Sequence, residues 1–176
     1  ASSLEVTTLR ASEDFYVDKL FASAPQHGAP LLQALYARAF LDVNREPWEL
    51  DPDMFDSPLP DYVNSRSGRV KAGLGTIARV VSNGTNIYSS KLRFSEVKAR
   101  VESIYMPYHN EQNDVMNKTR DQFGCAVLID CHSMPSAGDF YGDMSLRRPR
   151  AKMPDFILGN RYGRSCAPVV IDVAEG

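Results

Sequence analysis

The stretch CAVLIDCHSMP, residues 125 to 135, decides the fold class of this chain. Its first six residues form a nearly continuous apolar run that ends in Asp130, a pattern typical of a strand buried on both faces of a parallel sheet. The run FILG at 156 to 159 follows the same pattern. Because predicted strands alternate with predicted helices, we expect an α/β architecture with a largely parallel sheet.

The remaining segments complete this α/β pattern. A long helix is predicted in the middle of the chain, where Pro107 would kink or split it and Gly124 would end it. Turn residues and prolines separate the other elements. The predicted helices run from about Glu13 to Ala24, from Ser95 to about Gln122 and from Cys166 or Ala167 towards Glu175. Further strands are predicted at 39–44 and 76–81, and an irregular loop at 47–64.

The composition is that of a globular chain of 176 residues, with 43% hydrophobic and 24% charged residues. A net charge of -2 offers no broad positive field, so nucleic acid and anionic membrane surfaces are not expected partners. The first ten residues lack the pattern of a signal peptide, and no apolar run approaches the roughly 20 residues that span a bilayer. Three widely spaced cysteines predict a reducing, cytoplasmic location.

Two polar clusters follow predicted strands, at the place where open α/β sheets bind their ligands. In the later cluster, the two-residue period of a strand puts Asp130 and His132 on the same side, about 6.6 Å apart in Cα position. A neutral imidazole at a strand end is a common metal ligand, and a nearby carboxylate can fix its tautomer. The alternative is that this Asp-x-His sequence only caps the strand.

The earlier cluster contains Asn44 and Arg45. Arg45 offers a planar fork that suits a carboxylate, and Asn44 adds an amide donor beside it. The alternative is an ion pair between Arg45 and a nearby acidic residue. The acidic candidates for that pair are Glu46, Asp42 and Asp51.

Asp14 and His109 are further candidates for a site. Asp14 lies in the first turn of a predicted helix, where an acidic residue is either a metal ligand or ordinary capping chemistry. His109 ends the sequence YMPYH and is either a proton donor or substrate contact, or a structural residue of the helix. Local spacing does not choose between these roles.

Five motifs in this order resemble the N-formylglutamate amidohydrolase family. They are SEDFYVDKL (12–20), FLDVNREP (40–47), YMPYH (105–109), VLIDCHSMP (127–135) and PDFILG (154–159), and together they span nearly the whole chain. Each is weak alone, whereas five at compatible spacing are specific. The resemblance implies a fold similar to that of zinc carboxypeptidases and aspartoacylases, which is a three-layer helix/sheet/helix with a mixed, mainly parallel sheet, here as a single amidohydrolase domain over residues 1–176.

The resemblance also implies an activity and a cofactor. The activity is zinc-dependent hydrolysis of N-formyl-L-glutamate to formate and L-glutamate, a step of histidine degradation, with Zn²⁺ as the cofactor and a small N-acyl amino acid as the partner. The implied site residues are His132 and Asp130 in catalysis, Asn44, Arg45 and His109 in substrate binding, and His132 and Asp14 at the metal.

The chain departs from the family pattern in two segments. The family has an upstream Pro-His-Ser-Gly, whose histidine is the expected first zinc ligand, and a late glutamate, which is the expected general base. We therefore expect either a fragment that lacks an upstream and a downstream segment or a shortened relative. A non-catalytic carboxylate-binding domain of the same fold is the main alternative function. A related zinc hydrolase that cuts an acylated arginine, an acylated aspartate or a peptide end is another.

Overall fold

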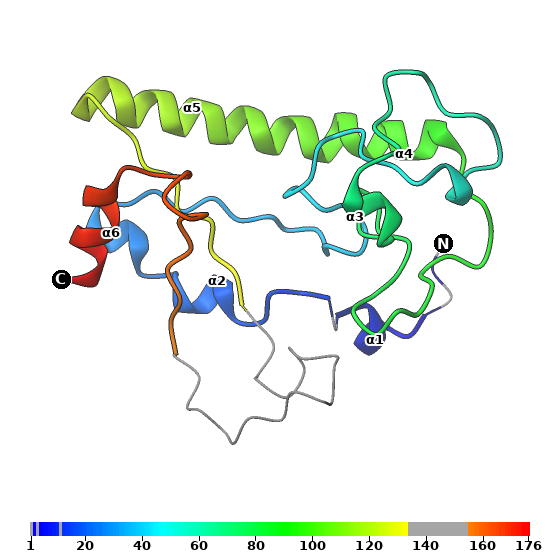
Figure 1. Cartoon of the computed structure of the whole chain (residues 1–176), viewed down its shortest axis with the longest axis horizontal. Coiled ribbons are helices and arrows are strands. Elements are labelled where there is room, and N and C mark those ends of the chain that lie inside the picture. Colours follow the sequence, from blue (N-terminus) through cyan, green and yellow to red (C-terminus); the bar gives the residue numbers. More distant parts are fainter. Residues whose placement is uncertain (1, 3, 11, 134–154) are drawn as a thin grey trace. The chain divides into compact units, whose positions relative to one another are not determined.

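A computed structural model describes residues 2, 4–10, 12–133 and 155–176 of the chain. The chain divides into two compact units, Ala1–Ala126 and Val127–Gly176, and each is described by itself. Figure 1 traces their helices along the sequence. The first unit contains α1 (Val6–Arg10), α2 (Val17–Leu20), η1 (Ala24–His27), η2 (Pro52–Met54), α3 (Gly68–Lys71), α4 (Phe94–Arg100), η3 (Val101–Tyr105) and α5 (Met106–Phe123), and the second contains α6 (Pro168–Glu175).

The long helix predicted for residues 95 to 122 is present as the consecutive segments α4, η3 and α5. η3 is a π turn in which the N–H of Met106 donates to the carbonyl of Val101. Pro107 follows in the first turn of α5, where its missing N–H costs least. The predicted interruption at Pro107 is therefore a local widening of the helix. Gly124 ends α5 in the left-handed conformation, with φ 76°, as predicted.

Helix boundaries nearer the N-terminus were predicted less well. The prediction of one helix from Glu13 to Ala24 is wrong, since only α2 and the 3-10 turn η1 form there. Tyr16 has φ 62°, a left-handed conformation that interrupts a right-handed helix. The predicted helix start at Ser95 is one residue late, because α4 begins at Phe94, after Arg93, and no side chain caps it.

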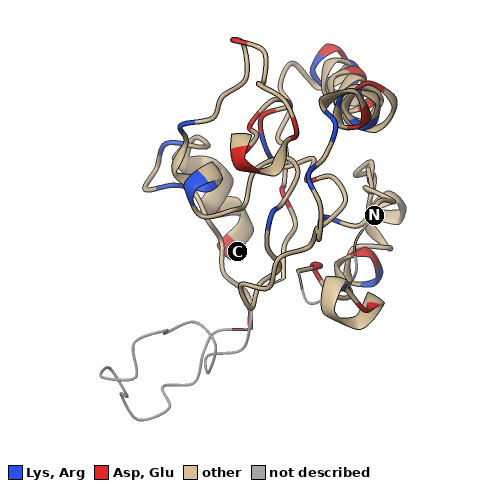
Figure 2. Ribbon diagram, turned by 90° about the vertical axis from the view of Figure 1, so that its right-hand side faces the viewer, with Lys and Arg blue, Asp and Glu red and all other residues tan. Residues whose placement is uncertain are grey.

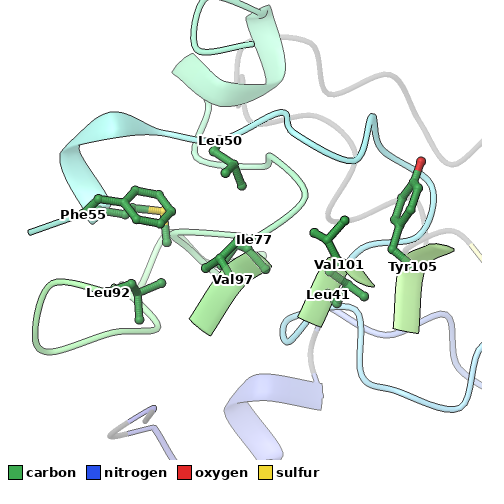
Figure 3. Close-up of a cluster of buried hydrophobic side chains, with 9 residues drawn as sticks. Leu41, Leu50, Phe55, Ile77, Leu92, Val97, Val101 and Tyr105 are labelled. Carbon is green, nitrogen blue, oxygen red and sulfur yellow. The ribbon is translucent and has the colours of Figure 1, made fainter. Parts of the chain in front are cut away.

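One face of α4 and η3 covers the main hydrophobic core of the first unit (Figure 3). Val97, Val101 and Tyr105, four residues apart, supply the helical side of this core. Fully burying a valine-sized side chain is worth about 1.5–3 kcal/mol, so this face fixes the helix on the unit. The other buried members are Leu41, Leu50, Met54, Phe55, Ile77 and Leu92.

The loop predicted for residues 47–64 is irregular but packed. It contains η2 and two isolated bridges, Glu49 with Asn64 and Phe55 with Leu92. Three of its side chains, at positions 50, 54 and 55, belong to the core. The segment therefore contributes to the core of the unit. Its sequence lacks the apolar periodicity from which burial is usually predicted.

Three predicted segments run side by side in the first unit through backbone hydrogen bonds. The N–H of Asp42 donates to the carbonyl of Thr76 at 2.8 Å, and the N–H of Thr76 donates to the carbonyl of Glu49 at 2.8 Å. Gly75 allows this close approach, because a Cβ there would overlap the carbonyl oxygen of Glu49. The described residues contain isolated β-bridges and no paired strands, so the three-layer fold with a mixed sheet stays a prediction.

The second unit holds α6, the apolar run at 156–159 and all but the first two residues of the run at 125–130, and both runs were predicted to be buried strands. α6 begins at Pro168, directly after the predicted start at Cys166 or Ala167, because proline suits the first helical position. Within the described structure the apolar runs are not buried, and Ile129 and Phe156 are 74% and 82% exposed. Positions 134, 135 and 154 of the quoted motifs lie outside the described residues.

Charge is mixed over the described chain. Figure 2 shows basic and acidic residues interspersed along the ribbon, in keeping with the net charge of -2. Among the described residues, the helices are all too short or too polar to cross a membrane.

Candidate functional site

Four alternating charges form a network in the first unit, made by Asp14, Arg38, Asp42 and Arg45. Arg38 Nε lies 2.8 Å from Asp42 Oδ2, and its Nη1 lies 3.3 Å from Asp14 Oδ2. Arg45 Nη2 approaches the same oxygen of Asp42 at 3.4 Å. Two cations and two anions leave this four-charge network neutral as a whole.

Asp42 is the centre of the four-charge network and is buried. While Oδ2 faces both guanidinium groups, Oδ1 accepts a hydrogen bond from the N–H of Asn44 at 3.0 Å. This Asx turn bends the chain directly before Arg45. Both oxygens of Asp42 therefore act on the segment that carries the predicted substrate-binding residues.

Arg45 is held on all three of its nitrogens. Nε donates to the carbonyl of Leu74 at 3.0 Å, Nη1 donates to the carbonyl of Asn44 at 2.6 Å, and Nη2 faces Asp42. These contacts use three of the five N–H groups of a guanidinium, which leaves at most two for a ligand. Burial lowers the pKa of Arg45, and the carboxylate of Asp42 opposes that change.

The structure decides which acidic residue pairs with Arg45. Asp42 is the partner, whereas Asp51 pairs with Arg79 at 2.8 Å and Glu46 accepts from Asn64 at 2.9 Å. The ion pair that the sequence analysis gave as the alternative is therefore formed, and it holds the guanidinium of Arg45 in a fixed orientation. A carboxylate could meet this fork only through its remaining N–H groups.

His109 lies beside the same segment, on the helix. Its Nε2 is 2.9 Å from the carbonyl of Val43, so Nε2 carries a proton, since a carbonyl only accepts. Its Nδ1 is 3.1 Å from Oε1 of Gln112. The ring packs against that of Tyr105 at an angle of 35°, with 4.2 Å between centroids. Both ring nitrogens of this predicted substrate-binding residue therefore face protein groups.

Tyr105 makes the matching contact one helical turn earlier. Its hydroxyl donates to the carbonyl of Arg45 at 2.6 Å. Burial raises the pKa of Tyr105, and the nearby carboxylates of Glu46 and Asp42 raise it further. The phenol therefore stays protonated, and able to donate, at neutral pH.

Asp130 and His132 lie in the second unit and contact each other directly. His132 Nε2 is 3.0 Å from Asp130 Oδ2, as the two-residue period of an extended chain predicts. Such a contact selects one tautomer of the imidazole. Cys131 lies between them, and its pKa is raised by burial and by the carboxylate of Asp130.

The predicted site residues thus fall into two groups. Asp14, Asn44, Arg45 and His109 belong to the first unit, and Asp130 and His132 belong to the second. Within the described ranges, no three His, Cys, Asp or Glu side chains gather closely enough to hold a metal ion. Asp14 instead contacts Arg38.

Sequence reasoning missed three members of the candidate site, namely Arg38, Asp42 as its centre, and Tyr105. Arg38 and Asp42 are four residues apart, but no helix contains them, so spacing gave no sign of their contact. Tyr105 and His109 are also four residues apart, within a predicted helix, and this spacing could have placed both on one face.

Comparison with known proteins decides the family. A family model described as N-formylglutamate amidohydrolase matches residues 1–176, the whole chain. The chain belongs to the N-formylglutamate amidohydrolase family. This confirms the family that the five motifs indicated.

Relatives and a solved structure agree with the N-formylglutamate amidohydrolase family. The chain is 32% identical over 165 residues to N-formylglutamate deformylase of Pseudomonas putida, covering 93% of this chain and 53% of the relative. It is 27% identical to the deformylase of Pseudomonas aeruginosa, covering 97% and 56%. The crystal structure of N-formylglutamate amidohydrolase from Ralstonia eutropha matches 99% of this chain and 61% of that chain, with 31% identity and a TM-score of 0.86. The chain thus spans about half the length of the curated relatives it matches.

Proposed function

We propose that the protein to which this chain belongs hydrolyses N-formyl-L-glutamate to formate and L-glutamate, as a step of histidine degradation. The match of the N-formylglutamate amidohydrolase model to all 176 residues carries this proposal. The deformylases of two Pseudomonas species support the substrate. Family membership is established, whereas the activity of the whole protein is what we propose.

In this proposal the first unit binds the glutamate part of the substrate. Arg45 is largely buried, with 12% of its side chain exposed, and its guanidinium is held in one orientation by Asp42 and by backbone carbonyls. A fixed fork loses little entropy when it binds a carboxylate. Asn44 is exposed beside it and would add an amide donor. Together they would fix the substrate for attack on its formyl carbon.

Zinc is the cofactor we propose, and the described residues supply only part of a site for it. A catalytic zinc takes three protein ligands, more than the described residues bring together. His132 suits the role of one ligand, because Asp130 holds its ring as carboxylates hold metal-binding histidines. Asp14 would need to give up its contact with Arg38 to become another. When bound, zinc would supply a water activated at neutral pH.

Formate release from N-formyl-L-glutamate by the full-length gene product, with zinc added, tests the proposal directly. Arg45→Lys keeps the charge and removes the fork, so we expect KM to rise roughly 10- to 100-fold. Arg79→Lys is the matched control, since Arg79 pairs with Asp51 elsewhere in the same unit, and we expect KM to stay unchanged. No turnover of any N-acyl amino acid by the wild type would overturn the proposal.

A non-catalytic carboxylate-binding domain remains the second candidate function. Asp14, the predicted metal ligand of the first unit, pairs with Arg38 in the four-charge network that orients Arg45, which favours carboxylate binding without catalysis. Calorimetric titration separates the two functions. Binding of L-glutamate without uptake of zinc supports the binding domain, and stoichiometric zinc supports the enzyme.

A further inference from the structure

The backbone that carries Asn44 and Arg45 is held by two side chains of one helical face. Tyr105 Oη donates to the carbonyl of Arg45 at 2.6 Å, and His109 Nε2 donates to the carbonyl of Val43 at 2.9 Å. Residues 43 and 44 form a turn and residue 45 a bend, so this turn sets the directions of the two carbonyls. Side chains four residues apart lie on the same side of a helix. Two donors on one helical face therefore hold the turn that precedes Arg45.

The carbonyl between these two is bound by Arg45 itself. Nη1 of Arg45 donates to the carbonyl of Asn44 at 2.6 Å. A change in the direction of the backbone at this segment would therefore move the guanidinium as well. The orientation of the fork depends on the carbonyls that Tyr105 and His109 hold.

The two helical side chains are themselves fixed. Tyr105 is buried in the main core, and its ring packs against the ring of His109. Tyr108 meets the imidazole edge to face, with 5.3 Å between centroids. Gln112 faces the remaining ring nitrogen. A rotation of either donor would have to displace packed neighbours.

We infer that Tyr105 and His109 are positioning residues, which hold the Val43–Arg45 backbone so that the fork of Arg45 and the amide of Asn44 face a substrate carboxylate. This inference rests on the proposed function. In this role His109 contacts the backbone that carries Arg45, and not the substrate itself. Neither residue needs to touch the ligand for its loss to weaken binding.

Titration of the full-length protein with L-glutamate tests this role. Tyr105→Phe removes one hydroxyl and keeps the ring, and we expect a Kd roughly 3- to 10-fold higher, as for the loss of one hydrogen bond. Tyr88→Phe is the matched control, because its hydroxyl accepts from Arg100 at 3.0 Å in the same unit, and we expect an unchanged Kd. Circular dichroism and urea unfolding would verify that each variant folds.

A double-mutant cycle separates positioning from mere support of the fold. If Tyr105 acts through Arg45, then Tyr105→Phe in an Arg45→Ala background leaves the remaining affinity unchanged. His109 gives a second, independent measurement should Tyr105→Phe fail to fold. His109→Gln retains an N–H that can donate to Val43 and should bind more tightly than His109→Ala.

The outcomes distinguish the two proposals. A wild type that binds neither L-glutamate nor N-formyl-L-glutamate overturns the proposed function, and the positioning role falls with it. A wild type that binds, with Tyr105→Phe and Tyr88→Phe equally unaffected, overturns the positioning role alone. Equal affinities of His109→Gln and His109→Ala would also contradict it.

Discussion

The carboxylate of Asp42 and the guanidinium of Arg45 lie 3.4 Å apart, and their side chains are only 8% and 12% exposed. A pair so little exposed loses most of its hydration on folding, and its members depend on each other. Arg38 adds a second cation to the same carboxylate oxygen. The pair therefore serves two purposes, since it orients the fork and compensates a buried charge.

Replacing Asp42 by Asn should destabilise the first unit strongly. Two guanidinium groups would lose their counter-charge, which for a buried pair costs about 3–5 kcal/mol. Urea unfolding measures the loss. Glu102→Gln breaks the exposed pair with Lys98 and should cost about 0.5 kcal/mol or less. Equal losses in the two variants would show that the network around Asp42 is not a buried one.

Tyr105 should make stability fall at high pH. Its folded pKa lies above the unfolded value of about 10, so the phenol ionises first in the unfolded chain. Its contribution is fully present below pH 10 and is lost as pH rises through the folded pKa. Because other groups titrate there too, the measurement is the difference in unfolding free energy between wild type and Tyr105→Phe. We expect this difference to shrink above pH 10.

Cys131 should react slowly with iodoacetamide. Burial and the carboxylate of Asp130 raise its pKa, so less thiolate is present near pH 8. Mass spectrometry of partly alkylated protein should find Cys125, which is exposed, modified before Cys131. Asp130→Asn removes one cause of the shift and should speed the reaction of Cys131. Faster labelling of Cys131 than of Cys125 in the wild type would contradict this account.

Gly75→Ala should be far more damaging than Gly68→Ala. A Cβ at position 75 would overlap the carbonyl of Glu49, and a backbone group cannot move aside as a side-chain end can. A Cβ at position 68 meets nothing within 4 Å. Thermal unfolding should therefore show a large loss of Tm for Gly75→Ala and little change for Gly68→Ala. The same Tm for both would mean that the segments at 49 and 75 separate easily.

The sequence predicted features that depend on local spacing. The helix between Phe94 and Phe123 follows from apolar residues at helical intervals, and its end follows from Gly124. The contact of Asp130 with His132 follows from the period of an extended chain. Each of these depends on residues a few positions apart, where backbone geometry decides the outcome.

Features that depend on distant partners were not predictable in this way. An apolar run such as 125–130 predicts burial only if other segments cover it, and the described residues do not do so. The core residues of the 47–64 loop have no periodic pattern because irregular backbone carries them. Arg38 contacts Asp14, 24 positions away, and no local rule connects the two.

The π turn at Val101–Tyr105 changes the direction in which the following side chains leave the helix. In a regular α-helix each step of four residues overshoots a full turn by about 40°, because 3.6 residues complete it. Two such steps would swing Tyr105 about 80° away from Val97, off the apolar interior. The wider turn reduces this drift. The same helix can therefore bury Val97 and Val101 in the core and direct Tyr105 and His109 towards the backbone of residues 43–45. Deleting one residue from that turn would rotate Tyr105 and His109 away from the backbone of residues 43–45 while the valines stayed in the core.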